Sequence, residues 1–231
     1  MMNSSNKELY PSNRGNKQNI RKSNKRKLSS TNWIKRQIND PYVIEAKKLG
    51  YNSRAAFKLL QIDNKFGFLK PSKKVIDLGC APGGWLQVAS QKVRSNEKHR
   101  NVVGVDLLPV ENIPGTKTFV GDINDPKIDK ILIDSLGDYP DIILSDMAAN
   151  VIGHKQTDHL RTTQLIEIAL DFTLKNLKKN GIFLVKTFKG GTETELLNIM
   201  KNNFKYVKNI KPLASRPESV ESYTICLELK A

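Results

Sequence analysis

Three aspartates in this chain each follow a short apolar run, where the carboxyl end of a buried strand is expected. Asp106 ends the run VVGVD, Asp122 follows FVG, and Asp146 ends DIILSD. The carboxyl ends of the strands in an open parallel sheet form its ligand crevice. One such aspartate is more often a helix cap or a turn residue. Three together favour a ligand with a ribose, an adenine amine and a positive centre, and S-adenosylmethionine has all three without a phosphate.

A glycine-rich turn supports this reading. The string KVIDLGCAPGGW, residues 74–85, has the pattern of a strand, a tight loop and the start of a helix, which is typical of a nucleotide-binding turn. Pro82 makes it unlike the dinucleotide pattern, because proline lacks the N–H that would cradle a pyrophosphate. Asp106 follows the glycines at about the spacing of a carboxylate that binds a ribose diol. The alternative is a turn without a ligand.

These strings and others resemble the FtsJ/RrmJ (RlmE) family of ribosomal RNA 2′-O-methyltransferases. The matching strings are SRAAFKL, DLGCAPGGW, VDLLP, GDI, LSDMAAN, FLVKTFKG and SRPESVESY. They run in order from Ser53 to Tyr223. Cys80 and Ala149 stand where the family usually has alanine and proline, and Lys189-Gly190-Gly191 departs slightly from its glycine-rich form. None of these differences removes a group with obvious chemistry.

The resemblance implies a catalytic tetrad and a cofactor site. The tetrad falls on Lys58, Asp146, Lys186 and Glu221. The predicted S-adenosylmethionine contacts are Gly83, Trp85, Asp106, Asp122 and Asp146. Trp85 is expected beside the cofactor loop, where its indole supplies apolar surface. The alternative is that the four tetrad residues form ordinary salt bridges.

Lys186 interrupts the apolar run IFLV, in a strand that should be central. A buried lysine is costly unless it is paired. Burial and a second cation, Lys58, would lower its pKa, whereas Asp146 would raise it. A neutral Lys186 could accept the proton of a ribose hydroxyl, and a charged one could only orient the oxygen and stabilise its charge. The sequence leaves both roles open. Asp146 is expected to hold Lys186, and Glu221 to fix the lysines or the ribose.

The substrate that the resemblance implies is a uridine in the A-loop of 23S ribosomal RNA, in the large ribosomal subunit. Transfer RNA and the messenger-RNA cap are alternatives, because related enzymes share the tetrad. A ribosome-assembly protein that binds RNA without reacting is another. No separate RNA-recognition domain is visible, which favours the ribosomal branch.

The elements that must position these residues alternate between strand and helix. Strands are expected near Val75, Val103, Phe119, Ile143, Leu184, Val207 and Ile225. Helices are expected over 42–49, 53–67, 86–93, 127–136, 160–177 and 193–203. Such alternation predicts an α/β fold with a mostly parallel sheet and helices on both faces. Seven strands match the Rossmann-like methyltransferase fold, and the resemblance implies one antiparallel strand near the C-terminus.

Charge is concentrated at the N-terminus of this 231-residue chain, whose formal net charge is +15. Residues 1–36 contain ten lysines and arginines against one acid, Glu8, so they carry +9 of that charge. They are poor in apolar residues, and we expect a disordered arm followed by one catalytic domain over 37–231. The arm either binds RNA phosphates or is a solvated tail.

The remaining composition bears on the compartment. There is no apolar run long enough to span a membrane and no apolar core of a secretory signal near the N-terminus. A basic transit peptide is an alternative reading of the arm. Two distant cysteines, Cys80 and Cys226, indicate neither a disulfide framework nor a zinc site. We expect a cytoplasmic monomer without a metal.

Overall fold

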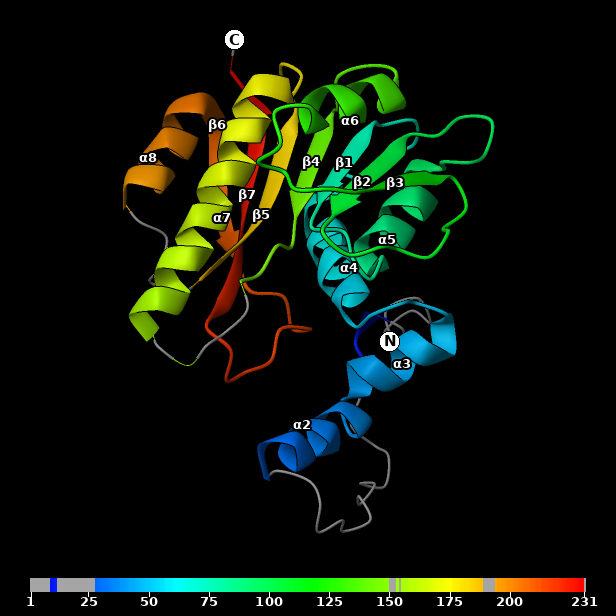
Figure 1. Ribbon diagram of the computed structural model, residues 1–231, viewed down its shortest axis with the longest axis vertical. Helices are drawn as coiled ribbons and strands as arrows, with labels where there is room; N and C mark the ends of the chain where they lie inside the picture. Colours follow the sequence, from blue (N-terminus) through cyan, green and yellow to red (C-terminus); the bar gives the residue numbers. More distant parts are fainter. Residues whose placement is uncertain (1–8, 12–27, 150–152, 154, 189–193, 231) are drawn as a thin grey trace.

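The computed structural model describes residues 9–11, 28–149, 153, 155–188 and 194–230. Seven strands form one sheet in the order β3-β2-β1-β4-β5-β7-β6 (Figure 1). In chain order they are β1 Val75–Leu78, β2 Val102–Asp106, β3 Thr116–Val120, β4 Ile142–Ser145, β5 Ile182–Phe188, β6 Phe204–Ile210 and β7 Glu221–Leu229.

All the neighbouring pairs up to β5 are parallel, whereas β7 runs antiparallel to both β5 and β6. This arrangement confirms the expected fold, including the single reversed strand. β1 and β4 are buried along their whole length, as strands covered on both faces must be. At one edge, β6 is mostly exposed and carries lysines, which discourages pairing with another chain.

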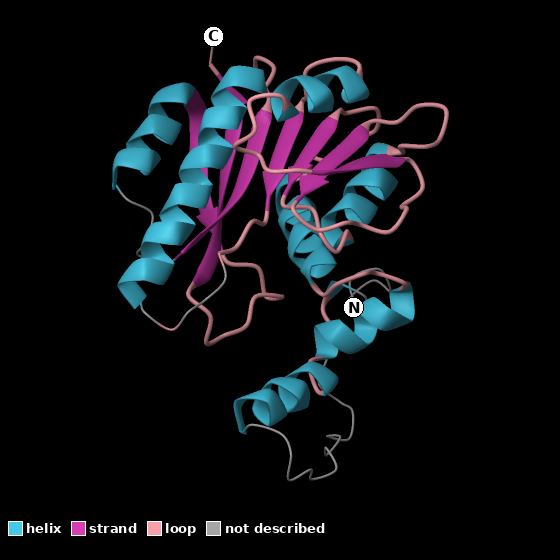
Figure 2. Cartoon of the chain, viewed as in Figure 1, coloured by secondary structure: helices cyan, strands magenta, loops and turns pink. Residues whose placement is uncertain are grey.

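Helices cover both faces of the sheet (Figure 2). The helices are α2 Leu28–Ile38, α3 Pro41–Leu49, α4 Ala55–Phe66, α5 Gly84–Val93, α6 Ile128–Leu136, α7 Lys155–Asn176 and α8 Thr194–Asn203. One core cluster joins α6, α7 and α8 to the sheet, and a second joins α4 and α5 to its other face. A small third cluster, Ala46, Phe57 and Ala214, fastens α3 to α4 and to the segment before β7.

The start of α3 is encoded locally. The Asp40 side chain accepts a hydrogen bond from the Tyr42 N–H, and Pro41 occupies the first turn. A short acceptor side chain followed by proline is a typical helix start. At the other end, Gly50 takes a left-handed conformation with φ of 76° and closes the helix.

The expected helices and strands are present, and their ends agree to within a few residues. The largest shift is in α7, which begins at Lys155 rather than Leu160. Part of the expected disordered arm differs, because Leu28–Arg36 lies within α2. The rest of the arm lies outside the described residues, apart from 9–11. None of the described helices combines the length and apolar character needed to cross a bilayer.

Candidate active site

The register of the sheet brings several of the predicted site residues together at the carboxyl ends of the strands. Leu78 on β1 is paired with Val105 on β2 and with Ser145 on β4, and Ser145 is paired with Val185 on β5. The next residues along these four strands are therefore level with one another. They are Gly79, Asp106, Asp146 and Lys186. Parallel strands bring their carboxyl ends to the same edge, so pairing alone assembles the glycine turn, two predicted carboxylates and the predicted lysine.

Lys186 is held by a single residue of the neighbouring strand end. Its Nζ lies 2.8 Å from Asp146 Oδ1 and donates a hydrogen bond to the Asp146 carbonyl oxygen at 3.1 Å. Glu221 Oε2 lies farther away, at 3.8 Å from the same nitrogen. The Lys186 side chain is 9% exposed, so the ammonium is buried but paired, as a buried charge must be.

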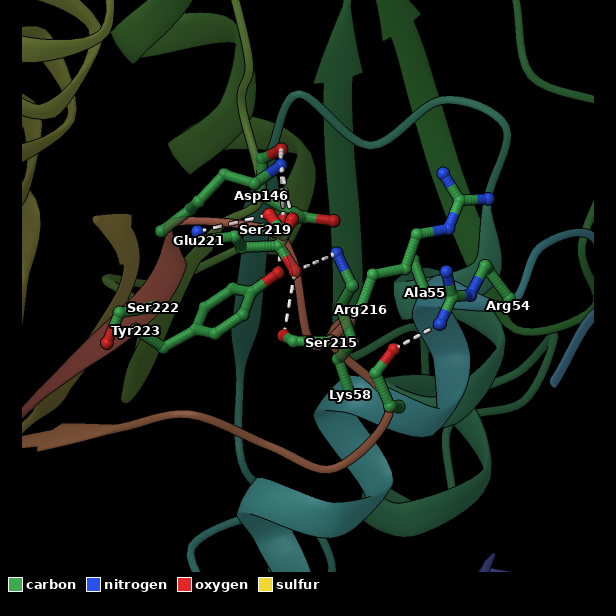
Figure 3. A network of polar contacts seen from close by, with 12 residues as sticks. Arg54, Ala55, Lys58, Asp146, Ser215, Arg216, Ser219, Glu221, Ser222 and Tyr223 are labelled. Carbon is green, nitrogen blue, oxygen red and sulfur yellow. Dashed lines mark hydrogen bonds and ion pairs between the residues drawn. The ribbon is translucent and has the colours of Figure 1, made fainter. Parts of the chain in front are cut away.

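Glu221 joins the second lysine to this group (Figure 3). Its Oε1 lies 2.8 Å from Lys58 Nζ and accepts a hydrogen bond from Ser215 Oγ, also at 2.8 Å. Lys58 comes from α4, which is far in sequence from the β5–β7 pair, and its side chain is 10% exposed. The structure thus brings all four predicted tetrad residues into one chain of contacts, Lys58–Glu221–Lys186–Asp146.

Tyr223 also belongs to this network, although the sequence did not predict it as a site residue. It is paired with Lys186 across the β5–β7 ladder, is fully buried, and donates from its hydroxyl to Asp146 Oδ1 at 2.7 Å. Its ring lies under Lys58 Nζ at 5.6 Å and 5.7 Å from the Trp85 ring. The available signal was the two-residue spacing from Glu221, which puts both side chains on one face of β7.

These contacts fix the protonation states. Burial alone would raise the pKa of Asp146, but the charges of Lys186 and Lys58 and the hydrogen bonds from Lys186 and Tyr223 bring it below its ordinary value. Burial would lower the pKa of Lys186, but Asp146 and Glu221 raise it above its ordinary value. Burial and the same two carboxylates hold the pKa of Tyr223 well above its ordinary value. At neutral pH the network therefore contains an ammonium, a carboxylate and an un-ionised phenol.

A pocket of about 420 Å³ opens beside this network, and Asp146 lines it. Asp106 and Asp122 line it as well, so all three strand-end aspartates reach the same cavity. Apolar walls come from Val105, Leu107, Leu108, Ile123, Met147 and Leu165. No lysine, arginine or histidine of the described residues lines this pocket. It suits a partly apolar ligand that carries positive charge.

The pocket carboxylates also organise the loops around them. Asp106 Oδ2 accepts a hydrogen bond from the Ala81 N–H and its Oδ1 from the Leu108 N–H, both at 2.9 Å. Asp122 Oδ1 accepts from the backbone and side-chain nitrogens of Asn124. A carboxylate can accept about four hydrogen bonds, so both aspartates keep capacity for a ligand.

Gly83 and Trp85, which were also predicted to contact the cofactor, lie away from the pocket lining. Gly83 precedes α5 with φ of 105°, and an added Cβ would lie 2.5 Å from Ile113 Cδ1. The Trp85 indole N–H donates to the Ala55 carbonyl at 2.9 Å. Neither residue is among those lining the pocket. Gly79 does line it, and a Cβ there would lie 2.4 Å from Met147 Cγ, so close approach of the two loops accounts for this glycine.

Comparisons with known proteins show to which family this chain belongs. The profile of the FtsJ-like methyltransferase family matches residues 51–229. "Ribosomal RNA large subunit methyltransferase E" of Mesorhizobium japonicum is 50% identical over 93% of this chain and 81% of its own length. The protein of the same name from Bartonella quintana is 52% identical, over 89% of this chain and 85% of its own.

A solved structure extends the comparison. It is a crystal structure of a Plasmodium falciparum protein assigned as a ribosomal RNA methyltransferase. The two chains superimpose with a TM-score of 0.67 at 33% identity, over 78% of this chain and 98% of the other. The matched family profile covers the tetrad, the pocket and the whole sheet. The chain therefore belongs to the family of FtsJ-like methyltransferases.

Proposed function

We propose that this enzyme methylates the 2′-hydroxyl of a ribose in the RNA of the large ribosomal subunit, using S-adenosylmethionine, and that its target is a uridine of the A-loop. We further propose that it acts as a monomer in the cytoplasm. The names of the relatives that are half identical to this chain support the substrate class. One observation carries the chemistry: Asp146 both lines the pocket and binds Lys186, so a pocket ligand and the lysine meet at one residue.

The residues of the pocket fit the proposed cofactor. When bound, S-adenosylmethionine supplies an electrophilic methyl group on a sulfonium centre. Asp106, Asp122 and Asp146 place three carboxylates around the cavity, which favours a ligand with a sulfonium and an ammonium group. The diol of its ribose needs acceptors, and Asp106 retains that capacity. A cofactor with a pyrophosphate would be repelled by the same carboxylates.

The tetrad would prepare the acceptor hydroxyl. A charged Lys186 donates a hydrogen bond to the ribose oxygen, orients it toward the pocket and stabilises negative charge that develops on it. Asp146 keeps Lys186 in place, and Tyr223 keeps Asp146 in place. As the hydroxyl oxygen takes the methyl group and the sulfur departs as a neutral thioether, the hydroxyl proton would leave to the Glu221 carboxylate or to water. Lys58, which is paired with Glu221 at 2.8 Å, would hold this carboxylate in position before the proton arrives.

The test is transfer of a labelled methyl group to isolated large ribosomal subunits that lack the modification. Small subunits, bulk transfer RNA and capped messenger RNA serve as parallel acceptors, and Lys186→Ala is the inactive control. We expect label only in large subunits, recovered as 2′-O-methyluridine by mass spectrometry of the digested RNA. Label in transfer RNA or in the cap instead would reassign the substrate, and no transfer to any acceptor would refute an active enzyme.

A further inference from the structure

A second cavity, of about 320 Å³, lies between the N-terminal helices and the segment before β7. Three arginines from three parts of the chain line it. Arg36 comes from α2, Arg54 immediately precedes α4, and Arg216 belongs to the segment 211–220. Two acids, Asp40 and Glu218, also line it, so the formal charge of the cavity is positive by one unit. Neither the pocket ligand nor the tetrad accounts for this gathering of arginines.

Asp40, which lines this cavity, already has hydrogen-bond and ion-pair partners. It is 9% exposed, and its Oδ1 accepts the hydrogen bond that begins α3. Its Oδ2 lies 2.9 Å from Arg54 Nη1 and 3.6 Å from Arg216 Nε. One carboxylate oxygen thus faces two guanidinium groups. A buried cation usually has a well-formed partner, and here two cations share one.

The two arginines differ in how firmly they are held. Arg54 binds Asp40 and donates a second hydrogen bond to the Ala214 carbonyl. Its Nε is buried without a partner among the described residues. Burial lowers the pKa of Arg54, and the positive charge of Arg216 lowers it further. Arg216 is more exposed, at 28% of its side chain, and Asp40 at 3.6 Å is its one ion-pair partner in the described part of the chain. Arg216 can therefore turn toward a new anion, whereas Arg54 is fixed.

Two short links connect the cavity to the tetrad, one along α4 and one through a hydrogen bond of Ser215 (Figure 3). Arg54 and Lys58 are four residues apart at the start of α4, so they are separated by about one helical turn. Ser215 lines the cavity and donates to Glu221 Oε1, and Arg216 is the next residue. In RNA, the carbon beside the one that carries the 2′-hydroxyl bears the 3′-phosphodiester. Any site that grips the hydroxyl must therefore accommodate a phosphate within a few ångströms.

We propose that this cavity binds a backbone phosphodiester of the substrate RNA beside the methylated ribose, with Arg216 as its hydrogen-bonding ligand. This inference rests on the proposed function. A guanidinium can donate two parallel hydrogen bonds to a phosphate. Arg54 supplies fixed positive charge behind it, and Arg36 adds charge at the exposed wall. Contacts to phosphate set the position of an RNA strand without reading its sequence. Arg216 would act through binding and positioning, and the chemistry would remain with the tetrad.

The experiment compares Arg216→Ala with the wild type on large subunits over a series of salt concentrations. We expect KM for the subunit to rise roughly tenfold, as for a lost hydrogen bond to a charged group, with kcat nearly unchanged. The slope of log KM against log salt should fall by about 0.7 to 0.9. Cofactor affinity by calorimetry and the thermal midpoint should stay at wild-type values. Lys130→Ala is the charge-matched control, because Lys130 is 81% exposed on α6 and pairs only with Asp134 among the described residues.

Unchanged KM and salt slope in Arg216→Ala would overturn the inference, and so would a loss of cofactor affinity, which would indicate a structural role. If Arg216→Ala folds poorly, Arg36→Ala replaces it, because Arg36 is exposed and should lower the slope in the same direction. RNA binding by anisotropy keeps the two proposals separate. A wild type without transfer, but with a salt slope that Arg216→Ala reduces, refutes the proposed function and leaves the cavity assignment standing.

Discussion

Lys186 is bound twice by Asp146, through the carboxylate at 2.8 Å and through the backbone carbonyl at 3.1 Å. The carbonyl contact depends only on backbone position, so it places the ammonium even when the carboxylate turns toward a ligand. Together the two oxygens use two of the three N–H donors of Lys186. The third can point toward Glu221, at 3.8 Å, or toward an acceptor hydroxyl. In the protein without ligands, Lys186 is therefore a cation with one N–H that can donate to a substrate.

Replacement of Lys186 by alanine should remove methyl transfer and leave cofactor binding nearly intact. The side chain contacts Asp146 and Glu221 and is not among the residues lining the pocket. Loss of a positioned charge stabiliser or proton-transfer group lowers a rate by roughly 10² to 10⁴. Calorimetry with S-adenosylmethionine, run beside the transfer assay, measures both. Lys205→Ala, an exposed lysine on β6, is the control. A Lys186→Ala enzyme that keeps most of its activity would remove the lysine from the mechanism.

The pH dependence of kcat separates the two roles of Lys186. Because Asp146 and Glu221 raise its pKa above the ordinary 10.5, it stays charged throughout the neutral range. If the charged form acts, kcat stays flat between about pH 7 and 9, because the required form is fully populated. If the neutral form must accept a proton, log kcat rises with pH at unit slope over the same range. We expect the flat profile, from single-turnover rates at saturating cofactor and RNA.

Asp106→Asn should weaken cofactor binding without abolishing folding. The substitution keeps the shape but removes the negative charge and one acceptor, and Asp106 also binds the Ala81 and Leu108 N–H groups. A lost hydrogen bond to a charged group corresponds to roughly ten- to hundredfold in affinity. Asp134→Asn, at an exposed aspartate of α6, is the matched control. Equal cofactor affinity in the two variants would restrict Asp106 to holding the loops together.

Asp77 is fully buried in β1, and neither of its carboxylate oxygens has a partner among the described residues. Burial, with Asp146 and Asp106 nearby, raises its pKa well above the ordinary 3.8. The folded state then binds a proton that the unfolded chain has released, so wild-type stability falls as pH rises from about 3.8 toward the raised pKa. Asp77→Asn should lose this component of the pH dependence. Urea unfolding from pH 4 to 8 measures it, with Asp134→Asn in parallel, and identical pH slopes in Asp77→Asn and wild type would contradict the raised pKa.

Deletion of residues 1–27 should leave the fold and cofactor affinity intact and reduce the salt dependence of RNA binding. The segment carries eight lysines and arginines against one acid, and affinity falls with salt at a slope of roughly −0.7 to −0.9 per neutralised phosphate. Among the described residues 9–11 of this segment, the Leu9 carbonyl accepts one hydrogen bond from Gln61, and its loss should not unfold the domain. Large-subunit binding across a salt series tests it. Equal slopes for the two forms would make the arm a passive tail.

The sequence by itself determined the order of the elements, because the alternation of apolar strands with amphipathic helices follows local side-chain periodicity. It also placed Asp106, Asp122 and Asp146 at strand ends, where the structure has them lining one cavity. The resemblance named four tetrad residues that the structure joins in one network. Part of the arm was misread, since α2 at Leu28–Ile38 is polar on average and follows a long stretch that is poor in apolar residues.

Only the tertiary structure decided which side chains are in contact and which protonation state each of them has. Tyr223 meets Asp146 because β7 runs antiparallel to β5 in a register that sets it opposite Lys186. Trp85 turned toward α4 and the Tyr223 ring. The charge on Lys186 depends on two carboxylates from distant parts of the chain. Register, burial and the distances between charges are properties of packed segments far apart in sequence. They exist only once the sheet has formed, so no local pattern of residues can specify them.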